Sequence, residues 1–148
     1  GTEAIGSLRT LTRTRLNAAG QTVASDDYFN LTGVTYSTAL ALGTLGTHFY
    51  RTTQDYDKQG RPNKSVSPAG TITRTVYDGL GRVLSTWVGT DDTPTTGFWS
   101  PSNLAGTDTV QVAGYAYDGG GVGDGNLTAI TLLPGGTEAP RITRTWYD

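Results

Sequence analysis

The chain of 148 residues contains no cysteine and no methionine, and it has a single histidine, His48. The absence of cysteine excludes disulfide bonds, thiol chemistry and cysteine-based zinc sites, but it leaves the cellular compartment open. Any histidine-based catalytic triad would depend on His48 alone, and no G-x-S-x-G motif accompanies it. We therefore expect His48 to be a structural strand residue beside Phe49 and Tyr50.

Long apolar runs and concentrated charge are also missing. Hydrophobic residues make up 35% of the chain, and no run approaches the roughly 18 apolar residues of a membrane span. The opening GTEAIGSLRT lacks the apolar segment of a signal peptide, so we expect any export signal to lie outside this sequence. The formal net charge is −2, and the basic residues are scattered rather than clustered. The sequence thus predicts neither a membrane span nor a nucleic-acid partner.

Threonine and glycine are abundant, with 27 and 21 residues. Threonine is β-branched and stiff at χ1, so it favours strands while remaining compatible with water. This composition predicts a β-rich chain whose sheet faces are wet rather than a domain with a thick core. Three N-x-S/T sequons, at Asn30, Asn63 and Asn126, are candidate glycosylation sites.

A short element, [Y/L]-[D/N]-x-x-G, recurs along the chain. Its copies lie in residues 12–23, 52–63, 73–84, 114–128 and 142–148. In the first copy the motif residues are Leu16, Asn17 and Gly20. In the later copies they are Tyr56, Asp57, Gly60 and Arg61; Tyr77, Asp78, Gly81 and Arg82; Tyr117 and Asp118; and Tyr147 and Asp148. Successive copies are 40, 21, 40 and 30 residues apart. The gaps of 40 predict two units each, with a degenerate middle copy such as FNLTGVTYSTALALGTLG (29–46).

The motif predicts a strand–turn–strand unit. Asp or Asn at the start of a turn bonds the backbone two residues on, and Gly three residues later takes the positive φ of a bulged hairpin. Residues 71–78 alternate with period two, and neither face is uniformly apolar, which indicates a single-layer sheet. We expect Asp78 and Arg82 to pair across one turn, and Pro62 and Pro68 to kink or bulge their strand.

A longer period encloses these units. GTEA at residues 1–4 returns at 136–139, and LTRTRLN at 11–17 is echoed by ITRTWYD at 142–148. Hairpins of this kind are marginal alone and gain stability by stacking on neighbours. We therefore expect the chain to be a segment of a longer array whose larger unit is roughly 130 residues.

YDGLGRVLST and YDKQGRP, with the weaker YAYDGG and RLNAAGQTV, resemble the RHS/YD-repeat family, whose mark is a strand that ends in YD before a Gly-Arg turn. The resemblance covers most of the chain, with insertions near 30–48 and 88–110. It implies a long β-sheet that spirals into a hollow shell or tube. Members of this family enclose toxin segments, act as surface adhesins or form the barrel of teneurins. The sequence has no Asp-Pro pair, the mark of self-cleavage in toxin-carrying shells.

Three groups of residues are candidates for chemistry. The pairs Asp26-Asp27 and Asp91-Asp92 could supply two carboxylates for glycoside hydrolysis, but adjacent acids on a strand face opposite ways, and we interpret them as solvated turn acids. Asp118, Asp124 and Asn126 could offer oxygen ligands to calcium, although their spacing departs from known calcium loops. Seven aromatic residues could form either platforms on which sugars stack or cross-strand packing pairs: Tyr28, Tyr36, Tyr50, Tyr115, Trp87, Trp99 and Trp146.

The sequence as a whole predicts an all-β fold of stacked antiparallel hairpins that form the wall of a hollow shell or tube. The hairpin units are expected near residues 11–25, 49–66, 71–88, 110–133 and 141–148. We expect a structural, non-catalytic segment without cofactor, at the cell surface or secreted, whose partners are neighbouring repeats of the same or identical chains. Two alternatives remain: the encapsulating shell of an RHS toxin around a cargo, and an adhesin that binds surface glycans.

Overall fold

The computed structural model describes residues 9–38, 42–106, 108–119 and 124–147. Nine strands and no helix occur in these ranges. The strands are β1 (Thr12–Leu16), β2 (Thr22–Tyr28), β3 (Phe49–Tyr56), β4 (Pro62–Val66), β5 (Ile72–Tyr77), β6 (Val83–Gly89), β7 (Val110–Tyr117), β8 (Leu127–Leu132) and β9 (Arg141–Arg144). The prediction of an all-β chain of antiparallel hairpins is confirmed.

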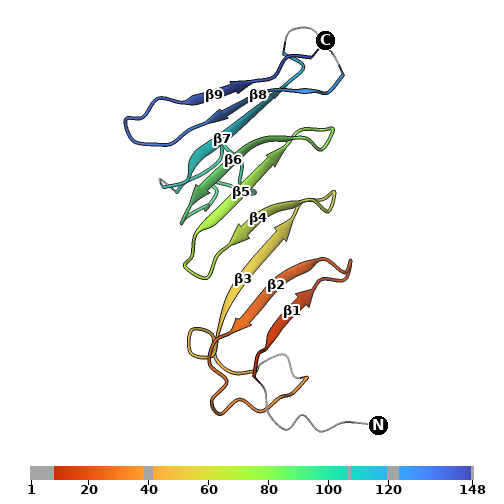
Figure 1. Ribbon diagram of the computed structural model, residues 1–148, viewed down its shortest axis with the longest axis vertical. Helices are drawn as coiled ribbons and strands as arrows, with labels where there is room; N and C mark the ends of the chain where they lie inside the picture. The colour runs from red at the N-terminus through yellow and green to blue at the C-terminus, as the bar shows by residue number, and fades with distance from the viewer. Residues whose placement is uncertain (1–8, 39–41, 107, 120–123, 148) are drawn as a thin grey trace.

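All nine strands lie in one open sheet in chain order, each antiparallel to the next. The sheet is an elongated, twisted ladder, with β1 near one end and β9 at the other (Figure 1). The motif turns, which close β1–β2, β3–β4, β5–β6 and β7–β8, lie along one long edge of this ladder, called here the motif edge (Figure 1). The connections between hairpins lie along the opposite edge. The described residues include no helix long and apolar enough to cross a membrane.

A β-bulge follows every motif turn. The register shifts by one residue between Arg15 and Leu16, Asp55 and Tyr56, Val76 and Tyr77, and Ala116 and Tyr117. The extra residue on the second strand is Val23, Asn63, Leu84 or Thr128. A bulge in β4 was predicted, but proline is the wrong reason for it, because three hairpins without a proline have the same bulge. Pro62 begins β4, and Pro68 lies in the β4–β5 turn.

The buried core is thin, as expected for one layer. Among the described residues only Ala24, Leu42, Phe49, Ile72 and Ala113 are buried hydrophobic residues. Large apolar side chains such as Leu80 and Phe98 remain more than four-fifths exposed. Ladder hydrogen bonds and contacts between neighbouring hairpins must therefore supply much of the cohesion that a core gives to a globular domain.

The described residues of the two 40-residue gaps form no degenerate hairpin. The described residues between β2 and β3 form only an isolated bridge from Leu45 to Phe49, and those between β6 and β7 only a bridge from Ser100 to Asn103. β2 pairs directly with β3, and β6 with β7. The segments 29–48 and 90–109 are therefore long connections on the edge opposite the motif turns, and the prediction of a middle copy is wrong.

Candidate functional site

The repeated turn has one construction at three places. In each, the first residue donates its amide to the carbonyl of the fifth, and the glycine donates back to the first, as in Asp57 to Arg61 at 2.9 Å and Gly60 to Asp57 at 3.0 Å. The carboxylate of Asp57 also accepts the amides of Gln59 and Arg61, both at 2.9 Å. Gly60 has a φ of 79°, which an L side chain rarely adopts. Corresponding bonds form in the turns 17–21 and 78–82.

In two of these turns an arginine pairs with the first residue. Arg61 Nε lies 2.6 Å from Asp57 Oδ2, and Arg82 Nε lies 2.7 Å from Asp78 Oδ2, so the expected pair across the turn forms. The side-chain bond from Arg82 holds the pKa of Asp78 below its ordinary value, against partial burial. Burial raises the pKa of Asp57, but the backbone and side-chain bonds from Arg61 outweigh burial and lower it. The turn carboxylates are therefore stabilised in their charged form.

A tyrosine links each hairpin to the one before it. Tyr77 Oη donates to the carbonyl of Pro62 at 2.8 Å, and Pro62 is the first residue after the preceding motif turn. The same bond recurs at the three other joints of the described sheet. Tyr56 donates to the carbonyl of Thr22 at 2.7 Å, Tyr117 to that of Val83 at 2.9 Å and Tyr147 to that of Leu127 at 3.0 Å. The tyrosine of the motif therefore points backwards along the array and fixes the spacing between hairpins.

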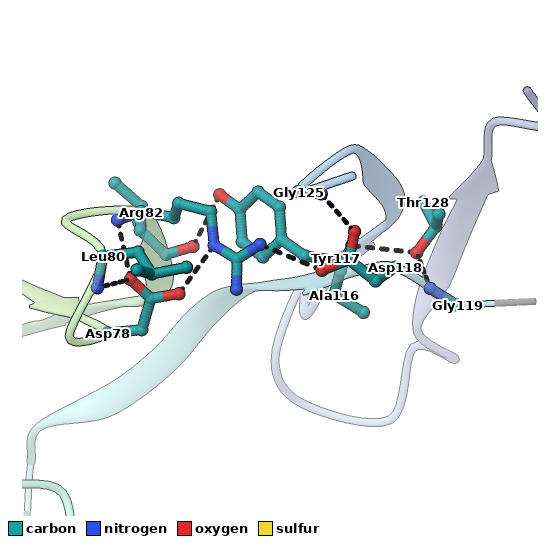
Figure 2. A network of polar contacts seen from close by, with 10 residues as sticks. Asp78, Leu80, Arg82, Ala116, Tyr117, Asp118, Gly119, Gly125 and Thr128 are labelled. Atoms are coloured by element: carbon teal, nitrogen blue, oxygen red, sulfur yellow. Dashed lines mark hydrogen bonds and ion pairs between the residues drawn. The ribbon is translucent and has the colours of Figure 1, made fainter. Parts of the chain in front are cut away.

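The arginine of each complete motif extends to the next hairpin and lies over the ring of that hairpin's motif tyrosine. Arg61 lies 4.5 Å from the ring centre of Tyr77, and Arg82 lies 4.4 Å from that of Tyr117. Figure 2 shows the Arg82 guanidinium between its own turn carboxylate, Asp78, and Asp118 of the next hairpin. The contact with Asp118 measures 3.1 Å. Each arginine thus joins two successive turns, which the sequence motif did not predict.

The first turn has glutamine rather than arginine at the last position of the motif, and the fourth turn has a longer loop. Gln21 donates its side-chain amide to the carbonyl of Gly60 at 2.7 Å, so the first turn still contacts the second. The fourth turn is longer, as predicted: the amide of Asp118 bonds the carbonyl of Asn126 at 2.9 Å. Asp118 has a φ of 57°, and its carboxylate accepts the amide of Gly125 at 2.5 Å (Figure 2). Asp148 lies outside the described residues.

Asp118, the first residue of the candidate calcium site, already has other bonding partners. The carboxylate of Asp118 already bonds Arg82 and the backbone of Gly125. Asp124 is exposed, and Asn126 is half-buried at the end of the loop. Within the ranges that the structure describes, no three acidic or histidine side chains come together as a metal site.

One acid of each pair is not a solvated turn residue, which corrects that expectation for Asp26 and Asp92, whereas Asp27 and Asp91 are exposed. Asp26 lies in β2 with no exposed surface, whereas its neighbour Asp27 is exposed on the other face. Arg51 on β3 bonds both oxygens of Asp26, at 2.5 and 2.8 Å, and Arg15 on β1 approaches at 3.3 Å. Burial raises the pKa of Asp26, but the bonds and charges of the two arginines outweigh it and lower the pKa. Asp26 therefore ties three strands together.

Asp92 has an equivalent role in the second long connection. Its side chain is 12% exposed, pairs with Lys64 of β4 at 3.0 Å and also bonds Arg74 of β5. Burial raises the pKa of Asp92, and the bonds from Lys64 and Arg74 more than compensate and lower it. Asp92 therefore fastens the connection 90–109 to the sheet, while Asp91 is exposed.

Several of the remaining candidates have structural contacts. His48 lies in the turn before β3 rather than in a strand, and its Nδ1 accepts the amide of Thr44 at 2.9 Å. Three aromatic pairs form: Tyr28 with Phe49, Phe29 with Tyr50, and Trp87 with Trp99 at 6.3 Å. Trp146, Tyr50 and Tyr36 keep 79%, 52% and 47% of their surface exposed, and Tyr115 is half-buried in β7. The sequons at Asn30, Asn63 and Asn126 are all half-buried, and glycosylation stays a prediction.

The structure is similar to that of known proteins at low identity. One match is the crystal structure of TcdB2-TccC3-TEV, with a TM-score of 0.40 and 17% sequence identity. The match covers 93% of this chain, which spans only 7% of the length of that chain. No protein-family description and no curated protein sequence matches the chain.

Proposed function

We propose that the chain is a structural, non-catalytic unit of an RHS/YD-repeat sheet, and that such sheets build the wall of a hollow tube or filament at the cell surface. The observation that carries the proposal is the tyrosine bond that recurs at four successive joints, from Tyr56 on Thr22 to Tyr147 on Leu127. A contact repeated at every joint lets an array extend without a new interface for each unit.

The position of β9 supports an array of this kind. The segment ITRT (142–145), which overlaps β9, corresponds to LTRT (11–14), which overlaps β1, and β9 pairs with β8 as the first strand of a further hairpin would. Tyr147 then bonds Leu127 as the earlier tyrosines bond their own partners. The four residues of β9 are exposed. Neighbouring repeats, of the same or an identical chain, are the partners that fit this edge.

The roles of the charged residues support a scaffold rather than an enzyme. Asp26, Asp92, Asp57 and Asp78 each bond at least one arginine that belongs to the same sheet. Their carboxylates hold strands and turns together, and the lowered pKa of each keeps it charged, so none resembles a carboxyl group raised for acid catalysis.

Electron microscopy of the protein isolated from its natural source tests the proposal. We expect long tubes of constant width with a regular axial repeat. Closed, capsule-sized particles with internal density would contradict the filament and support an encapsulating shell. Small particles without a continuous sheet wall would contradict both forms of the proposal.

A further inference from the structure

The last described strand, β9, repeats β5 in sequence and in register. ITRTVYD at residues 72–78 returns as ITRTWYD at residues 142–148, with six of the seven residues identical. Each strand pairs with the strand before it in the same register, so Arg144 faces β8 as Arg74 faces β4. The two arginines are therefore equivalent, and the surroundings of one can be compared with those of the other.

Arg74 is covered by the long connection 90–109. Its Nε donates to Asp92 Oδ2 at 2.6 Å, and the ring of Trp99 lies 4.9 Å from its guanidinium. Trp99 also packs edge-on against Trp87 of β6. The side chain of Arg74 is only 15% exposed. An acid and, seven residues later, a tryptophan thus close over one arginine of β5.

Arg144 lacks this cover. It is exposed, and it forms no ion pair with any other residue that the structure describes. With Thr128, Thr145 and Trp146 it lines a hollow of about 220 Å³, and Trp146 keeps 79% of its surface exposed. The equivalent hollow between β4 and β5 is closed on one side by the connection 90–109. The site on β8 and β9 is therefore the same site without its covering segment.

The chemistry of the open site defines what covers it. An unpaired arginine is complemented by a carboxylate, and its guanidinium and the exposed indole of Trp146 both accept an aromatic ring. Ala129 occupies the position of Lys64, so this site has one cation where the covered site has two. One acidic side chain is therefore sufficient here.

The order of hairpins along the chain shows where such a segment comes from. The two hairpins that begin with the sequence TRT, β1–β2 and β5–β6, are each followed by a long connection, 29–48 and 90–109. β9 carries the same TRT sequence. A hairpin begun by β9 would therefore be followed by a long connection as well.

From this equivalence we propose that the hollow over β8 and β9 receives the long connection of the next hairpin, through an acid that bonds Arg144 and an aromatic ring that lies over its guanidinium. The two groups correspond to Asp92 and Trp99, and the partner is the continuation of the array in the same or an identical chain. The inference rests on the proposed array, and it adds a contact that fastens each such connection to the hairpin before it.

The experiment extends the chain after Asp148 with a second copy of residues 79–103, which completes the hairpin that β9 begins and adds the first part of a connection. Because the chain has no cysteine, Ala129→Cys places a single thiol in the hollow. We expect maleimide to label this thiol at least about tenfold more slowly in the extended chain than in the 148-residue chain. The backbone amides of β9 should also gain protection from hydrogen exchange.

Three variants of the extended chain test the named groups. Arg144→Ala, and in the added copy Asp92→Asn or Trp99→Ala, should each restore most of the labelling rate, measured against the same background without the extension. Arg141→Ala is the matched control on the same strand, because Arg141 pairs with Glu138 and does not line the hollow. Labelling of this control should stay slow.

The possible failures are distinguishable. Fast labelling together with protected β9 amides would show that the hairpin forms without docking of the connection, which overturns this inference and leaves the array standing. Unprotected β9 amides would contradict continuation of the sheet, and the docking and the proposed function would fail together. Slow labelling that survives Arg144→Ala would mean that a different segment covers the hollow, and would also overturn the inference.

Discussion

The hydroxyl group of Tyr77 donates a 2.8 Å hydrogen bond to the carbonyl oxygen of Pro62, across the joint between two hairpins. Because Arg61 also covers the Tyr77 ring, one residue of the third hairpin is held by two residues of the second. In a sheet with so few buried apolar residues, contacts of this kind decide whether neighbouring hairpins keep their register.

Tyr77→Phe is expected to lower the free energy of unfolding by about 1 kcal/mol, because it removes the hydroxyl and leaves the Pro62 carbonyl to water while keeping the ring. Urea unfolding followed by circular dichroism measures the change. Leu80→Ala is the control and should fall within about 0.5 kcal/mol of the wild type, since Leu80 is 81% exposed. Equal midpoints for Tyr77→Phe and the control would show that the tyrosine bond adds nothing.

The first joint lacks the arginine of the second and third, and supplying it should stabilise the chain. The double variant Asn17→Asp with Gln21→Arg gives the first turn the residues that pair Asp57 with Arg61 and that place Arg61 over Tyr77. The new cation–π contact on Tyr56 is expected to add about 0.5–1 kcal/mol. The single variant Asn17→Asp measures the effect of the turn residue alone, without the new contact on Tyr56. A double variant no more stable than the single one would argue against the arginine–tyrosine contact.

The local part of this structure followed from the sequence, and the contacts between distant segments did not. The turn 57–61 was predictable because its bonds span four residues, and the strand 72–77 because its side chains alternate. The pair Asp26 and Arg51 was missed, since the 20 residues between β2 and β3 hide the register that sets them opposite each other. Once that register is known, opposite charges at facing positions are a readable signal.

A similar limit applies to the long connection 90–109. Nothing local marks Trp99 as the partner of Trp87, because the described residues of this connection form no strand pair that a period could reveal. The bulge predicted in β4 is present, but its cause was wrongly assigned to proline: the bulge belongs to the repeated turn, so it recurs with valine, leucine or threonine in place of Asn63.

Asp26→Asn is expected to be strongly destabilising. The change removes the charge that neutralises Arg51 and Arg15 in a fully buried position. Losing one partner of a buried pair costs about 3–5 kcal/mol, and we expect about 2–4 because both arginines retain some contact with water. Thermal unfolding measures the loss. Asp27→Asn, on the exposed face of the same strand, should change little, and equal effects of the two variants would contradict the role given to Asp26.

Gly89→Ala tests how the second long connection packs on the sheet. A Cβ atom on Gly89 would lie 2.6 Å from the Cα of Thr109, a backbone atom that cannot move aside without shifting the connection. We expect a loss of about 1–3 kcal/mol, as for overpacked sites. Gly79→Ala is the control, since its Cβ would meet no atom within 4 Å. A neutral Gly89→Ala in urea unfolding would mean that Thr109 is not held against β6.

The stability of the chain should fall in acid. The pKa values of Asp26, Asp57, Asp78 and Asp92 are all lowered in the folded state from an ordinary value of 3.8. Below that value the unfolded state binds more protons than the folded state, so the stabilisation is complete above pH 3.8 and is lost as the pH falls through the lower folded-state values.

Urea midpoints measured from pH 7 to pH 2 test this dependence. The midpoint should be nearly constant down to about pH 5 and decrease below about pH 4. Asp92→Asn should decrease less steeply than the wild type, because one carboxylate with a lowered pKa is gone, whereas Asp27→Asn should follow the wild-type curve. A midpoint that rises on acidification would require carboxylates with raised pKa values, and would contradict the pairing of these four acids with their cations.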